Sequence, residues 1–72
     1  MPPYAQIAAW LRGLIASGEL GPGDRLPSAL DLSQSFGVAI MTARKALALL
    51  VDENLAYRSQ GLGTFVRERQ AP

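Results

Sequence analysis

The sequence predicts a mostly helical domain in which three helices are followed by a small antiparallel β-hairpin. Two observations carry this prediction. Between residues 4 and 53, apolar side chains recur at the three- and four-residue spacing of amphipathic helices. After residue 54, residue types alternate with the period of a strand on both sides of two closely spaced glycines, which is typical of a hairpin.

The first helix is expected over residues 4–17, where Ile7 and Leu11 begin a series of apolar residues at helical spacing. The next segment, residues 18–24, contains three glycines and one proline, a composition that favours turns. We expect residues 25–26, which follow this turn, to add one short strand pairing.

A second, short helix should begin after Ser28 as its N-cap and end at Gly37, which tolerates the left-handed conformation of a helix terminus. Asp31 lies three residues after the cap, where the helix dipole favours a carboxylate. Leu32 and Phe36 are expected to form the buried side of this helix.

A third helix is expected over residues 39–53, with Asn54 as the left-handed residue after its end. It ends on two acidic residues, 52–53, which a helix dipole disfavours at that position. At about 100° per residue, one face is apolar and predicted to be buried, namely Ala43, Ala46, Leu47 and Leu50. The opposite face carries Met41, Arg44, Lys45 and Ala48.

Two strands are expected on either side of the segment Gly61-Leu62-Gly63, over residues 55–60 and 64–67. The second and third helices, joined by a tight turn, form a helix-turn-helix, and the hairpin behind them is a wing. The predicted fold is therefore a winged helix-turn-helix domain over residues 1–67. Residues 68–72 are expected to be a flexible C-terminal tail.

Composition argues against an enzyme. The chain has no cysteine and no histidine, which excludes disulfides and zinc sites built on thiolate or imidazole. The six carboxylates are scattered over turns, helix ends and the tail, so no catalytic pair is apparent. We expect no cofactor and no metal. The formal net charge is only +1, so any argument for a nucleic-acid partner depends on where the charges lie.

Nothing in the sequence indicates a membrane partner. The N-terminus lacks the basic segment of a signal peptide, and the longest uncharged apolar run, residues 46–51, is far too short to span a bilayer. A soluble, cytoplasmic protein is expected.

From Tyr4 to Val66 the sequence resembles the DNA-binding domain of bacterial GntR-family transcription regulators. The segments that carry the resemblance are, among others, Leu26-Pro27-Ser28, Phe36-Gly37-Val38, Thr42-Ala43-Arg44-Lys45-Ala46-Leu47 and Gly61-Leu62-Gly63-Thr64-Phe65-Val66. The resemblance implies a sequence-specific module for double-stranded DNA in a transcription regulator, expected to be a repressor. Its third helix would enter the major groove and its wing tip the minor groove.

In that family a larger domain, which binds a metabolite and dimerises, follows the DNA-binding domain. No such domain is visible in this sequence. We therefore expect no small-molecule effector within this chain, and homodimerisation on DNA stays open.

On this interpretation Arg44 contacts a base, because a guanidinium can bind guanine O6 and N7 together. Lys45 and Arg58 are expected to neutralise phosphates. Thr42 has two interpretations, a hydrogen bond to phosphate or one back to its own helix. Ser28 is expected to cap the second helix, and the N-terminus of that helix is also expected to bind a phosphate near Ser28. The tip of the wing supplies the remaining expected contacts, Gly61, Gly63 and Thr64.

Ile40 and Met41 leave several interpretations open. Both side chains could pack on thymine methyl groups, Ile40 could instead belong to the core, and both could form a protein-binding patch. The family commonly has Arg at the positions of Leu30 and Ile40, and Ser or Thr at that of Ala39. These departures from the family keep two rival functions open: a plasmid or phage accessory DNA-binding factor, and a winged helix used for protein–protein interaction.

Overall fold

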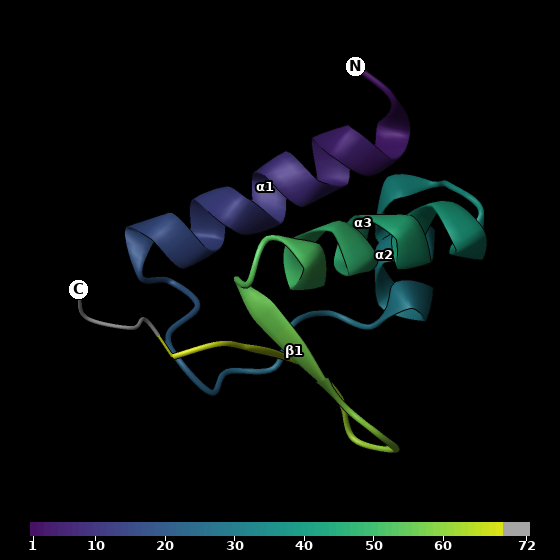
Figure 1. Ribbon diagram of the computed structural model, residues 1–72. Helices are drawn as coiled ribbons and strands as arrows, with labels where there is room; N and C mark the ends of the chain where they lie inside the picture. The colour runs from purple at the N-terminus through teal and green to yellow at the C-terminus, as the bar shows by residue number, and fades with distance from the viewer. Residues whose placement is uncertain (69–72) are drawn as a thin grey trace.

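The computed structural model describes residues 1–68, and its elements follow the predicted order (Figure 1). The helices are α1 (Pro3–Ser17), α2 (Ala29–Phe36) and α3 (Ile40–Asp52), and the strands are β1 (Ala56–Ser59) and β2 (Gly63–Val66). Apart from Glu68, the expected tail of residues 68–72 lies outside the described residues. None of the helices among residues 1–68 combines the length and apolar character that crossing a membrane requires.

The core lies where α1 and α2 pack against α3. Ile7 and Leu11 of α1 and Leu32 of α2 are fully buried there. On α3 the predicted buried face is confirmed, since its four members are all buried. Three of the four, Ala43, Ala46 and Leu50, have no exposed surface at all, and the two small alanines let the backbones of neighbouring helices approach closely. The core thereby fixes which face of α3 remains outside.

The helix-turn-helix is held by local hydrogen bonds at both ends of α2. The Ser28 hydroxyl accepts from the Asp31 N–H at 3.0 Å, which confirms the expected N-cap. Gly37 ends the helix at φ 66°, as predicted. The Ser33 hydroxyl then donates to the carbonyl of Val38, so the short turn into α3 is tied back to α2.

Phe36 departs from the expected burial. Its side chain is 41% exposed, and its ring meets that of Trp10 edge-on with centroids 5.5 Å apart. Phe36 is the last residue of a helix of only eight residues, so no further turn of α2 covers it. It therefore lies at the rim of the core and contacts α1.

Glu53, which follows α3, has a partner on α1, whereas Asp52 forms no ion pair within residues 1–68. The Arg12 guanidinium donates from Nε and Nη2 to the two carboxylate oxygens of Glu53, at 2.8 and 2.9 Å. The hydrogen bonds from Arg12 to Glu53 raise the pKa of the guanidinium. Asn54 follows at φ 62°, which confirms the expected left-handed residue.

The wing is a two-stranded antiparallel hairpin that projects from the helices (Figure 1). The predicted pairing before α2 is confirmed, because Arg25 forms a bridge to Phe65 on the free side of β2. Leu26 N–H donates to the Thr64 carbonyl at 2.8 Å and fixes this segment in place. Gly63, which was expected at the tip, instead begins β2, and the turn itself spans residues 60–62.

Candidate nucleic-acid interface

A hollow of about 350 Å³ opens where the start of α2, the middle of α3 and the wing meet. Arginines from three separate parts of the chain line it: Arg25 from the segment before α2, Arg44 from α3 and Arg58 from β1. We call this feature the arginine hollow. Its remaining lining residues are Leu26, Ser28, Ala29, Leu47, Gly63 and Thr64.

The positive charge of the arginine hollow is not compensated locally. No acidic residue lines it. Within residues 1–68, the one ion pair is that of Arg12 with Glu53, which joins α1 to the end of α3 and does not involve the hollow. Three guanidinium groups around one depression concentrate positive potential there, although the chain as a whole is nearly neutral. The geometry favours an anionic group with several acceptor oxygens.

The fold brings these arginines together by different means. Arg44 lies on the exposed face of α3 because the opposite face forms the core. Arg58 pairs directly with Thr64 across the hairpin. Arg25 is extended and exposed beside buried Leu26, since successive side chains of an extended chain point in opposite directions.

Gly63 lets the Arg25 side chain approach the wing. A Cβ atom at Gly63 would lie only 2.8 Å from Arg25 Nε, and the residue has φ +132°, which side chains other than glycine's disfavour. The Arg25 guanidinium thus lies against bare backbone. Glycine here serves the placement of a charge as well as the geometry of the hairpin.

The N-terminus of α2 adds backbone donors to the arginine hollow. Ser28 Oγ takes the Asp31 N–H, and the Ser28 carbonyl takes the Leu32 N–H. The N–H groups of Ala29 and Leu30 have no acceptor among the described residues. Free N–H groups at the positive end of a helix dipole bind anions.

The structure brings half of the predicted contact residues together. Those that line the arginine hollow are Ser28, Arg44, Arg58, Gly63 and Thr64. Those outside it are Ile40, Met41, Thr42, Lys45 and Gly61. Arg25 was not predicted as a contact residue, because only a short strand pairing was predicted for residues 25–26. The alternation of charged Arg25 with apolar Leu26 in an extended segment could have predicted that the Arg25 side chain is exposed.

The residues outside the hollow differ in exposure. Lys45 is directed toward α1, with its Nζ 4.2 Å from the centroid of the Tyr4 ring. Thr42 is half-buried, and its hydroxyl makes no hydrogen bond to another residue in the part of the chain described. Ile40 and Met41 are exposed, so the interpretation of Ile40 as a core residue is wrong. Gly61 lies in the exposed turn at φ 78°.

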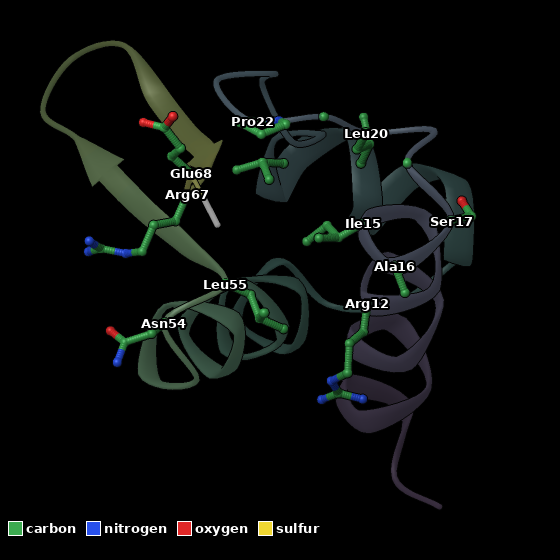
Figure 2. A pocket seen from close by; sticks show the side chains of 13 residues that line it. Arg12, Ile15, Ala16, Ser17, Leu20, Pro22, Asn54, Leu55, Arg67 and Glu68 are labelled. Carbon is green, nitrogen blue, oxygen red and sulfur yellow. The ribbon is translucent and has the colours of Figure 1, made fainter. Parts of the chain in front are cut away.

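A larger hollow, of about 620 Å³, shares no lining residue with the first (Figure 2). It lies between the C-terminal end of α1, the turn after it, and the end of β2. Ile15, Leu20 and Leu55 supply apolar lining, whereas Arg67 points away from it in this view. We call it the apolar hollow. Across residues 1–68, no three acidic side chains come together in a way that could hold a metal ion.

A comparison of the sequence with models of known protein families agrees with the fold described above. The sequence model of the bacterial regulatory proteins of the gntR family matches residues 3–66. This chain belongs to the GntR family. The match runs from the start of α1 to the end of β2 and therefore includes every residue of the arginine hollow.

Curated relatives of this GntR-family chain include named repressors. The mannosyl-D-glycerate transport/metabolism system repressor MngR of Escherichia coli is 46% identical over 69 residues, which are 96% of this chain and 29% of the relative. The transcriptional repressor NagR of Bacillus subtilis is 47% identical over 66 residues, 92% of this chain and 27% of the relative. The chain thus spans less than a third of these relatives.

Solved structures share the fold. The AraR DNA-binding domain in complex with operator ORX1 superposes with a TM-score of 0.87 at 41% identity, over 92% of this chain and 80% of that one. YtrA from Sulfolobus acidocaldarius, a GntR-family transcription factor, gives a TM-score of 0.84 at 39% identity, over 99% of this chain and 60% of that one. Both confirm the winged helix-turn-helix.

Proposed function

We propose that this GntR-family chain is a sequence-specific module that binds double-stranded DNA in a bacterial transcription regulator and acts in repression. The observation that carries the proposal is the arginine hollow, which Arg25, Arg44 and Arg58 line as exposed residues that have no acidic partner within residues 1–68. Phosphate oxygens are the acceptors that such a cluster and a free helix N-terminus bind best. Binding alone, without a catalytic step, is the proposed activity.

In the proposed complex α3 lies in the major groove and the wing follows the adjacent backbone. Arg44 contacts a base from the exposed face of α3, while Arg25 and Arg58 bind phosphates on either side of the wing. Gly61 and Thr64 are proposed contacts of the wing, and Ser28 positions the N-terminus of α2 on the backbone. Five of these six residues line the arginine hollow together with Gly63, and Gly61 lies in the turn beside it.

Lys45 and Thr42 are proposed as weaker contacts. The Lys45 ammonium lies over the Tyr4 ring, so reaching a phosphate requires it to leave that cation–π contact. Thr42 is half-buried in the first turn of α3 and has a free hydroxyl to offer.

The regulator is further proposed to be cytoplasmic and to bind as a homodimer, since regulators of this architecture commonly occupy two half-sites. The relatives named as repressors favour transcription control over the plasmid or phage accessory role. The described domain is proposed to bind DNA without a small-molecule effector of its own.

A titration with random-sequence duplex DNA at low salt, followed by amide NMR shifts, tests the proposal. Shifts are expected at Arg25, Arg44, Arg58 and the turn of the wing, whereas Ile15 and Leu55 in the apolar hollow should stay unchanged. A domain that instead serves protein–protein interaction would show no shifts with DNA, and that result would refute the proposed function.

A further inference from the structure

The first turn of α3 presents apolar side chains to solvent beside the arginine hollow. Met41 is 66% exposed, Ile40 38% and Leu30, in the first turn of α2, 55%. Ala39, which precedes α3, is exposed as well. Burial of large aliphatic side chains is what a core normally achieves, so this exposed group needs a partner.

The polar side chains near this surface are few. Lys45 is directed to Tyr4, and Thr42 is half-buried. Arg44 remains, and its Nη1 lies 3.9 Å from Met41 Sδ. The single free guanidinium on this part of α3 is therefore in contact with an apolar neighbour, among the residues that the structure describes.

The apolar surface is continuous with the arginine hollow. Arg44 lines the hollow and touches Met41, and Leu30 directly follows Ala29, which also lines it. A partner must therefore offer anionic groups to the hollow and apolar groups to Ile40 and Met41 within one interface. In duplex DNA the phosphates satisfy the first requirement, and the C5-methyl of thymine, which faces the major groove, satisfies the second.

Aliphatic side chains also select against G·C pairs. A G·C pair has no methyl group in the major groove, and its donors and acceptors would lose water against Ile40 or Met41 without gaining a hydrogen bond. Resting on the proposed function, we infer that Ile40 and Met41 are specificity-determining residues that select thymine through its C5-methyl. The adjacent Arg44 supplies the polar base contact of the same helix turn.

Replacement of thymine by deoxyuridine tests this inference, because it removes the methyl group and leaves the pairing edge intact. Duplexes bound by the domain are selected from a random pool, and single thymines of the selected site are replaced. Each contacted methyl should contribute roughly a fourfold change in Kd, as expected from burying one methyl group. Thymines outside the selected site serve as the control and should have no effect when replaced.

Variants of Met41 test whether this side chain is the one that contacts the thymine methyl group. At the thymine that Met41 contacts, Met41→Ala should bind thymine and deoxyuridine duplexes equally, whereas Met41→Leu, which keeps an aliphatic group, should keep the fourfold preference. Met41 is largely exposed, so both variants are expected to fold, and thermal unfolding verifies it. Selection of G·C pairs at every position opposite α3, with no thymine beside the base that Arg44 contacts, would overturn the inference, and so would an unchanged Kd at every deoxyuridine. In both cases tight DNA binding would still uphold the proposed function. Absence of DNA binding would remove both, and self-association through Met41 would then point to a protein partner.

Discussion

Gly63 links the conformation of the wing to the placement of a charge. Its φ of +132° is one that an alanine adopts only under strain, and an added Cβ would lie 2.8 Å from Arg25 Nε. Both effects act in the folded state, but the guanidinium can move while the backbone angle cannot. The strained angle therefore dominates the cost of a substitution here.

Gly63→Ala should lower the free energy of unfolding by about 1–3 kcal/mol. Gly13 is the matched control, because it lies inside α1 with nothing within 4 Å of an added Cβ. Gly13→Ala should raise the free energy of unfolding by about 0.5–1 kcal/mol, since alanine is the better helix former. Urea unfolding measures both, and equal effects of the two variants would contradict this explanation.

A substitution of Arg44 can distinguish a contact with a base from a contact with a phosphate. Arg44→Lys keeps the positive charge but loses the planar fork that binds guanine bidentately. If Arg44 contacts guanine, this variant should lose about 1–3 kcal/mol of binding to a selected duplex and little to a random one. Anisotropy titrations with both duplexes measure the difference, and equal losses on the two would assign Arg44 to phosphate.

The N-cap of α2 stabilises the start of the helix-turn-helix. Ser28→Ala removes the acceptor of the Asp31 N–H and should lower the free energy of unfolding by about 1 kcal/mol. Ser35 is also in α2, is exposed, and its side chain makes no hydrogen bond within the described residues, so Ser35→Ala should change it by less than about 0.5 kcal/mol. Thermal unfolding of the pair tests the cap, and a neutral Ser28→Ala would count against it.

Elements with local signals could be predicted from the sequence. Helical spacing placed α1 and α3, Ser28 and Gly37 placed the ends of α2, and alternation around glycines placed the wing. Phe36 was predicted wrongly because its position at the end of a short helix, not its type, decides its burial. The apolar spacing within α2 cannot show how far α1 and α3 cover the last residue of α2.

Contacts between distant segments could not be predicted. The pair of Arg12 with Glu53 joins residues 41 positions apart, and it provides a partner for Glu53 at the end of α3. The approach of Arg25 to Gly63 likewise requires three segments of chain to be in place. Sequence reasoning found five of the nine residues that line the arginine hollow, four of them in segments that resemble the family and Arg58 beside the wing tip. It missed Arg25, whose neighbours come from the tertiary fold.

A domain with a net charge of only +1 can bind a polyanion because its charges are unevenly distributed. The arginine hollow holds three of the seven basic residues and no acidic one, while a further arginine is paired with Glu53 far from it. The fold therefore separates the arginine hollow, the proposed face for DNA, from the apolar hollow, with which it shares no lining residue. Arg67, which lines the apolar hollow, provides a control with the same charge.

The dependence of DNA affinity on salt tests this separation most directly. If three to five phosphates are neutralised, a plot of log K against log salt concentration should have a slope of about −3 to −4.5. Arg25→Ala and Arg58→Ala, which remove proposed phosphate contacts, should each reduce the magnitude of that slope by about 1, whereas Arg67→Ala should leave it unchanged. A slope near zero, or an Arg67→Ala variant whose slope falls as much as those of Arg25→Ala and Arg58→Ala, would contradict the assignment of the arginine hollow to DNA.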